Sequence, residues 1–112
     1  MKFKTSDLDD VTVLAISGKI MGGPDRDRFY DEIKRLINED RRKILLDFGK
    51  VPWINSTGLG ILISGYASLK RADGRMMICN VNDRVLSLFY TAQLHDVFET
   101  HETREQALAA FA

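Results

Sequence analysis

The segment Lys43–Phe48, K-I-L-L-D-F, is the feature of this chain that most constrains its fold. Its apolar residues are nearly continuous, whereas a strand with one face in water alternates apolar and polar side chains. A run of this length therefore predicts a central strand that is covered on both faces, as in parallel sheets. Met76–Val81 has a similar composition and predicts the next strand.

The rest of the chain alternates strand-like and helix-like patterns around these two strands. Phe3–Leu8 and Val11–Ser17 predict an antiparallel hairpin, with Asp9 and Asp10 in its turn. The full order is strand, strand, helix, strand, helix, strand, helix, strand, helix. This order predicts one α/β domain over residues 1–112, with a mixed sheet of about five strands packed against about four helices.

Apolar residues three or four positions apart mark the buried faces of the first two helices. The predicted faces are Phe29, Ile33, Leu36 and Ile37 in the first helix, and Leu59, Leu62, Ile63, Tyr66 and Leu69 in the second. Gly74 follows the second pattern and is predicted to end that helix in a left-handed conformation.

Two capping signals organise the last third of the chain. Asn82 is predicted to cap a third helix, and Thr103 with Gln106 three residues later fits a capping box before a fourth. The third helix is expected to bury Val85, Leu88, Phe89 and Ala92, and the fourth to carry Ala107, Leu108 and Phe111 on its apolar face. Between the two helices, Val97 and Phe98 predict a short last strand.

The charge balance argues against a nucleic-acid-binding protein. Lys and Arg number 16 and so do Asp and Glu, giving a formal net charge of zero, whereas nucleic-acid-binding surfaces are basic. No apolar stretch approaches the ~20 residues of a membrane span, and the N-terminal segment is too polar for a signal peptide. The single Cys79 is expected to be buried and fits a reducing compartment. We therefore expect a cytoplasmic protein that contacts neither membrane nor nucleic acid directly.

The residues that commonly carry catalysis lack the spacings that such reactions need. His95 and His101 lie in a polar segment without a metal-ligand pattern, which predicts solvated side chains. Ser56 lies in N-S-T-G, not in a G-x-S-x-G nucleophile elbow. The glycines of T-G-L-G, Gly58 and Gly60, form only a fragment of a phosphate-binding loop and are expected to allow close helix packing. The sequence thus predicts a protein that is not an enzyme, with no catalytic residue, metal or cofactor.

The segment W-I-N-S-T-G-L-G predicts an anion-tolerant start of the second helix. Asn55 is suited to the N-cap, which places Ser56 and Thr57 in the first turn, where free backbone N–H groups and the helix dipole favour negative charge. A phosphoryl group on Ser56 would add about −1.5 to −2 charges without disrupting the helix. From spacing alone, the simpler interpretation is that both hydroxyls only cap or solvate the helix start.

A resemblance to a known family changes that weighting. The segment V-P-W-I-N-S-T-G-L-G-I-L-I closely resembles the D-S-[ST]-G-L-G signature of STAS domains, specifically the small bacterial anti-sigma-factor antagonists. S-G-K-I resembles the family's G-x-[IL] entry into its first helix, and K-I-L-L-D-F resembles its central strand. N-D-R-V-L-S-L-F-Y-T-A-Q-L resembles the helix before its last strand. The resemblance thus covers essentially the whole chain.

The resemblance implies a partner switch. Antagonists of this family bind a Ser/Thr kinase that is also an anti-sigma factor, and free the sigma factor that it held. They are inactivated when the kinase phosphorylates the first hydroxyl after the acidic residue of the motif, which corresponds to Ser56 here. A metal-dependent serine phosphatase restores the active form, so ATP and metal would belong to these partners. The alternative is a STAS accessory or scaffold subunit of a transport or signalling complex, without a phosphorylation cycle.

Two departures from the family pattern affect the predicted site. Asn55 stands where the family usually has Asp, and the loop Ile20–Asp25 lacks the acidic residue that commonly follows G-x-[IL]. In the family this loop lies beside the helix start. The residues predicted to contact the partner are Met21, Gly22, Asn55, Ser56, Thr57 and Gly58. Trp53 is expected to lie in the core.

Overall fold

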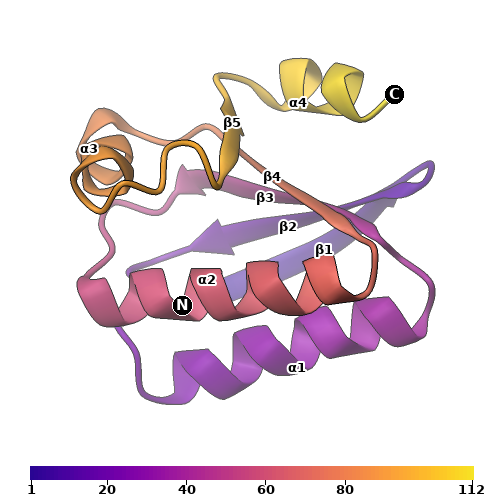
Figure 1. The fold of residues 1–112 in the computed structure, drawn as a ribbon, viewed down its shortest axis with the longest axis horizontal. Coiled ribbons are helices and arrows are strands. Elements are labelled where there is room, and N and C mark those ends of the chain that lie inside the picture. The colour runs from indigo at the N-terminus through magenta and orange to yellow at the C-terminus, as the bar shows by residue number, and fades with distance from the viewer.

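The computed structural model describes all 112 residues, which form one five-stranded sheet and four helices (Figure 1). The strands are β1 (Lys2–Leu8), β2 (Val11–Ser17), β3 (Lys43–Lys50), β4 (Arg75–Cys79) and β5 (Glu99–His101). The helices are α1 (Pro24–Asn38), α2 (Ser56–Arg71), α3 (Asp83–Thr91) and α4 (Arg104–Phe111). The predicted α/β class and the order of the elements are confirmed.

The strands lie in the sheet in the order of the chain, β1-β2-β3-β4-β5, so β3 is central as predicted. β1 pairs with β2 in antiparallel fashion around a turn in which Asp9 has φ 57°. The other neighbours are parallel. The carboxyl ends of β2, β3 and β4 therefore meet at one end of the sheet, where the connections to α1, α2 and α3 begin.

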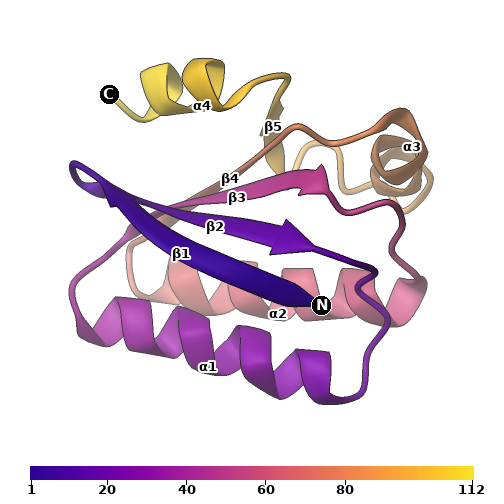
Figure 2. The same cartoon turned by 180° about the vertical axis from the view of Figure 1, so that it is seen from behind.

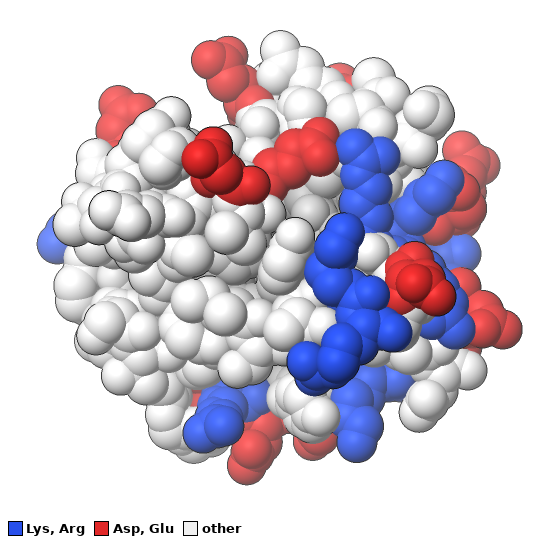
Figure 3. Space-filling model, viewed as in Figure 1, with Lys and Arg blue, Asp and Glu red and all other residues white.

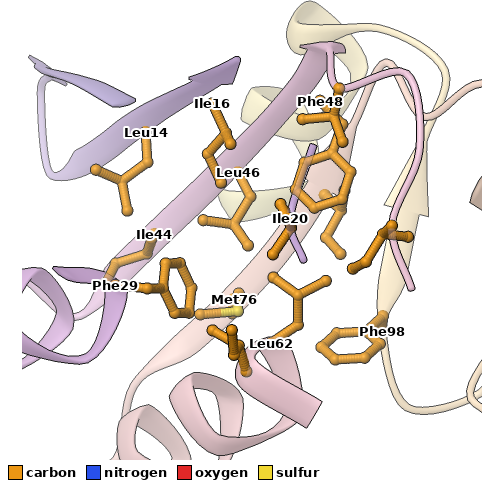
Figure 4. Packing of buried hydrophobic residues seen from close by; sticks show 14 of the residues in the cluster. Leu14, Ile16, Ile20, Phe29, Ile44, Leu46, Phe48, Leu62, Met76 and Phe98 are labelled. Carbon is orange, nitrogen blue, oxygen red and sulfur yellow. The ribbon is translucent and has the colours of Figure 1, made fainter. Parts of the chain in front are cut away.

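Helices cover both faces of the sheet, which explains the apolar character of its central strands. α1 and α2 lie side by side on one face, α4 lies over part of the other, and α3 lies beyond the end of β3 (Figures 1 and 2). The larger core, between the sheet and α1 and α2, includes Leu14, Ile16, Phe29 and Leu46 (Figure 4). The smaller core lies beneath α4 and contains Val11, Val13, Leu45, Met77, Cys79, Ala107 and Phe111.

The residues of the predicted helix faces are buried or half-buried, with two exceptions. Phe29, Ile33 and Leu36 are buried and Ile37 is half-buried, because α1 turns this side toward α2 and the sheet. In α2, Ile63 is 39% exposed and the prediction that it lies in the core is wrong. Gly65 is buried in its place, because α2 passes so close to α1 that a Cβ there would clash with the ring of Phe29. The second exception is Ala92, which is exposed at the end of α3, while Tyr66, Leu88 and Leu108 are half-buried.

Several boundaries differ from the prediction by a few residues. β4 begins one residue before the predicted start at Met76 and ends two residues before the predicted end at Val81. β5 begins just after Val97 and Phe98, of which only Phe98 is buried. The left-handed residue after α2 is Asp73, with φ 62°, not Gly74. Gly74 is buried instead against Leu69, and a Cβ there would approach the carbonyl oxygen of Arg42 to 2.9 Å.

The predicted helix caps are largely confirmed. Asn82 accepts a hydrogen bond from the N–H of Val85 at 2.8 Å, and Thr103 accepts one from the N–H of Gln106 at 3.1 Å. The reciprocal bond of the capping box is shifted by one residue, because the side chain of Gln106 accepts from the N–H of Glu102. None of the four helices has the length and apolar character needed to cross a membrane.

Candidate functional site

Asn55 fixes the start of α2, as the sequence predicts. Its backbone is extended, with φ −98° and ψ 179°, and its side-chain oxygen accepts a hydrogen bond from the N–H of Gly58 at 2.7 Å. Its side-chain nitrogen donates to the carbonyl oxygen of Met21 at 3.1 Å. One side chain therefore caps the helix and ties it to the connection between β2 and α1.

Ser56 and Thr57 occupy the first two positions of α2, and both are exposed. Neither hydroxyl forms a hydrogen bond with another protein group, and the first turn contains no acidic residue. The backbone N–H groups of these two residues have no partner within the helix, and the positive end of the helix dipole lies there. The Ser56 hydroxyl can thus be reached by another protein, and a negative charge on it would be stabilised locally.

The connection after β2 lies directly beside this helix start. Ile20 forms an isolated parallel bridge with Ile54, and the N–H of Asn55 donates to the carbonyl oxygen of Ile20 at 3.4 Å. Gly22 has φ +111°, and a Cβ there would approach the methyl carbon of Thr57 to 2.8 Å. Met21 is 42% exposed. The structure therefore places Met21 beside Asn55 and Gly22 beside Thr57 at the start of α2, although the sequence separates them by more than thirty positions.

Gly58 departs from the predicted partner-binding set because it is buried. A Cβ there would clash with the carbonyl oxygen of Ile20, so the residue allows the first turn of α2 to press against the connection after β2. Its role is close packing, not surface contact. Gly60, for which close packing was also predicted, is exposed and has open space around its Cα.

Trp53 lies at the edge of the site and is half-buried, so the prediction of a core position holds only in part. The fully buried neighbour is Ile54. The guanidinium of Arg84, at the start of α3, lies over the Trp53 ring, 5.5 Å from its centroid. This cation–π contact links the approach to α2 with the start of α3.

An uncharged surface extends along α2 from the exposed hydroxyls. Ser56–Leu69 contains no charged residue, and Figure 3 shows a broad area without Lys, Arg, Asp or Glu over this part of α2. A shallow hollow of about 460 Å³ adjoins it between α2 and the start of α1. Its lining includes Gly22, Thr57, Ser64 and Arg26. Sequence analysis did not single out Arg26, because only the fold brings the first turn of α1 next to α2.

The other side chains considered for chemistry lie elsewhere. His101 contacts Glu99 at 2.9 Å, and this contact holds the pKa of the Glu99 carboxyl below its usual value. His95 stacks on Tyr90, with 4.6 Å between the ring centroids. Cys79 is buried as predicted, and burial raises the pKa of its thiol to about 12. A thiol with this pKa is not an activated nucleophile.

Comparisons with known proteins identify the family to which this fold belongs. The sequence model of the STAS domain family matches residues 2–107 of this chain. The protein BtrV from Bordetella bronchiseptica, named as a proposed anti-sigma factor antagonist, is 22% identical over 99% of this chain and 95% of its own. A structure from Thermotoga maritima, also named as a proposed anti-sigma factor antagonist, has a TM-score of 0.81 at 20% identity, over 96% of this chain and 92% of that one.

The fold is also similar to that of SpoIIAA from Bacillus, a cell fate determinant, in its phosphorylated form. The TM-score is 0.75 at 17% identity, over 99% of this chain and 100% of that one. At this level of identity the likeness concerns the fold, whereas the family match extends over nearly all of the sequence. The chain belongs to the STAS domain family.

Proposed function

We propose that this protein is a cytoplasmic anti-sigma-factor antagonist that binds a Ser/Thr kinase anti-sigma factor. Phosphorylation of Ser56 by that kinase releases the complex, and a serine phosphatase restores the binding form. The protein is a substrate and a ligand in this cycle, not an enzyme. The observation that carries the proposal is the exposed Ser56 hydroxyl at the first position of α2, with no protein partner and no acidic residue in that turn.

The helix start suits a modification that leaves the fold intact. A phosphoryl group on Ser56 carries about −1.5 to −2 charges at the end of the helix where free N–H groups and the dipole favour an anion. The capping bond joins the side-chain oxygen of Asn55 to the N–H of Gly58 and does not involve the Ser56 hydroxyl. A phosphate on Ser56 therefore does not compete with the cap. The modified protein is therefore expected to stay folded.

The surroundings of Ser56 explain how a phosphate would block docking. Ser56–Leu69 presents no charge to a partner. A partner surface that is complementary to it therefore needs no cation at this position. Burying two uncompensated negative charges at such an interface is expensive. A penalty of about 3 kcal/mol would weaken binding over a hundredfold.

The relatives support the same role. BtrV and the Thermotoga maritima protein carry names that assign them to the anti-sigma factor antagonists, and SpoIIAA has been described in a phosphorylated form. Asn55 replaces the Asp that is usual in the family, but it caps α2 with a bond of 2.7 Å, so the hydroxyl is held in the same type of position. Of the remaining predicted contacts, Met21 is bonded to Asn55 and Gly22 lies against the side chain of Thr57, the residue after Ser56.

Substitutions at Ser56 test the proposal. Binding of the cognate kinase would be measured by surface plasmon resonance for the wild type, Ser56→Ala and Ser56→Asp. We expect Ser56→Ala to bind as the wild type does and Ser56→Asp to bind at least tenfold more weakly, since it adds one charge in place of two. Incubation of the wild type with kinase, ATP and Mg²⁺ should add one phosphate, located on Ser56 by mass spectrometry.

Two controls separate the site from general charge effects. Ser6→Asp places the same charge on an exposed residue of β1, on the sheet face opposite α1 and α2, and should leave binding unchanged. Thr57→Ala should remain a substrate, because Ser56 is the predicted acceptor. Equal binding by Ser56→Ala and Ser56→Asp would overturn the switch and favour the accessory or scaffold subunit.

A further inference from the structure

A second concave site lies on the face of the sheet opposite α1 and α2. α4 covers only part of this face (Figure 2), because it packs on Val11 and Val13 of β2 and leaves Ala15 and Ser17 partly exposed. A hollow of about 530 Å³ remains beside α4. Its floor includes three residues with small side chains or none, Ala15, Ser17 and Gly49, so ligand atoms can approach the sheet closely.

Four cations surround this hollow: Lys2, Lys4, Lys50 and Arg104. The strand register brings them together, because Lys2 and Lys50 both pair with Ser17 from opposite sides, and Lys4 pairs with Ala15 in the adjacent position of β1. Directly opposed residues of neighbouring strands lie about 5 Å apart. We call this site the basic hollow.

Arg104 is held in place by a nearly buried carboxylate. The Nε and Nη2 groups of Arg104 donate to one oxygen of Asp47, at 3.3 and 2.7 Å. The other oxygen of Asp47 accepts from the N–H of Gly49 at 2.9 Å and from the side chain of Asn80 at 3.0 Å. The Asp47 side chain is only 13% exposed, so its hydrogen-bonding capacity is used inside the protein. The Nη1 group of Arg104 has no protein partner and is left for a ligand.

Three of the four cations of the hollow are not neutralised by other side chains, whereas the charge of Arg104 is balanced by Asp47. The side chains of Lys2, Lys4 and Lys50 form no ion pair or hydrogen bond in the structure, and Asp47 is the only carboxylate in the lining. Other cations are paired, as Lys43 is with Asp10 at 2.6 Å. In a chain of zero net charge, this local excess marks a place where an anion is favoured.

We propose that the basic hollow binds a small phosphate-bearing anion. Lysine ammonium groups and a guanidinium with a free edge are the side chains that recognise phosphate oxygens. The Ser17 hydroxyl, in the row between Lys2 and Lys50, adds a neutral donor. The cations converge on one hollow and do not follow an extended groove, which fits a compact ligand better than a polypeptide. This site is independent of Ser56, which lies at the start of a helix on the other face of the sheet.

An NMR titration of the ¹⁵N-labelled full chain with pyrophosphate tests the proposal. We expect saturable shifts that are concentrated at the backbone amides of Ser17, Gly49 and Lys50. In the double variant Lys2→Gln/Lys50→Gln, affinity should fall about tenfold or more, because two charge-assisted contacts are lost. The matched control Lys34→Gln/Lys70→Gln removes two exposed lysines outside the hollow and should bind as the wild type does. Parallel titrations with ATP and with inorganic phosphate identify the source of the phosphate group.

Three results would overturn the proposal. The first is the absence of saturable shifts with pyrophosphate, ATP and phosphate at low ionic strength. The second is an equal loss of affinity in the hollow variant and its control, which would indicate general screening of charge. The third is saturable binding of a hexaglutamate peptide in the hollow with higher affinity than any of the three phosphate compounds, which would assign the site to an acidic segment. Thermal unfolding of both double variants checks that they remain folded.

Discussion

The first turns of α2 and α3 are built alike but carry different charges. Each helix follows an Asn whose side-chain oxygen accepts a hydrogen bond from the third helical residue, at 2.7 Å from Gly58 and 2.8 Å from Val85. The first residue of α3 is Asp83, whereas the first residue of α2 is Ser56. The positive end of α3 therefore has a permanent counter-charge and that of α2 has a hydroxyl.

This difference shows how a switch can be placed on a stable frame. The cap holds the helix in both cases, so the residue after it is free to vary in charge. α4 provides a third arrangement, because its first residue is Arg104, whose charge is balanced by Asp47 at 2.7 Å. Among these three capped helices, only α2 has a hydroxyl at its first position, and the proposed phosphorylation of Ser56 depends on that group.

The largest expected effect concerns the third residue of α2. Val85 occupies this position in α3. In α2 the position is Gly58, where an added Cβ would clash with the carbonyl oxygen of Ile20. Gly58→Ala should destabilise the protein by about 3 kcal/mol, since the clash is with backbone, as measured by urea denaturation. The control Gly60→Ala meets open space and should stabilise by about 0.5–1 kcal/mol. Equal stability of Gly58→Ala and the wild type would show that the third position of α2 accommodates a side chain as readily as that of α3.

The next effect tests the charge balance at the start of α4. Burial raises the pKa of Asp47, but hydrogen bonds from Arg104, Asn80 and Gly49 outweigh it and hold that pKa below 3.8. Because the folded-state pKa is lowered, this stabilisation is complete above pH 3.8 and is lost as the pH falls through the folded-state value. Asp47→Asn should cost about 2 kcal/mol at neutral pH and should remove this pH dependence, as followed by denaturation at several pH values. A mutant that keeps the wild-type acid sensitivity would assign that sensitivity to another group.

Removing the caps should affect α2 and α3 to a similar extent. Asn55→Ala and Asn82→Ala each lose a capping bond, and we expect a loss of about 1 kcal/mol in each case. Asn55 also donates to the carbonyl oxygen of Met21, and Asn82 to those of Val51 and Pro52, so each Asn also ties its helix to an earlier segment of the chain. Denaturation curves of the two variants, compared with the corresponding Asn→Asp variants, separate the cap from these second bonds. A loss confined to one helix would mean that the two starts are not equivalent.

The sequence predicted the frame of the site because that frame depends on local chemistry. The cap at Asn55, the two hydroxyls in the first turn and the central strand K-I-L-L-D-F follow from residues close together in the chain. The same holds for the hairpin around Asp9. In each case the local preference and the final packing agree.

The contacts that sequence reasoning missed are those between distant segments. Gly58 is buried only because the connection after β2 crosses over it, and Ile63 is exposed only because α1 approaches α2 at Gly65. The pairing of Arg104 with Asp47 joins residues 57 positions apart. A glycine or a charged residue has the same local signal in a turn, at a close approach or in an ion pair, so these roles depended on the tertiary structure.

The smallest expected effect exchanges the two first residues and tests the comparison most directly. Ser56→Asp gives α2 the charge that α3 already has, and Asp83→Ser removes it from α3. Because both positions lie at the positive end of a capped helix, the first change should raise and the second should lower the free energy of unfolding, by about 0.3–1 kcal/mol each. Thermal unfolding at low salt would measure both shifts, and added salt should reduce them together.

A destabilised Ser56→Asp would mean that the start of α2 does not tolerate an anion, so that phosphorylation would perturb the fold and not only the docking surface. Opposite shifts of similar size would instead show that α2 accepts negative charge as readily as α3 does, which is the property that a reversible phosphate requires.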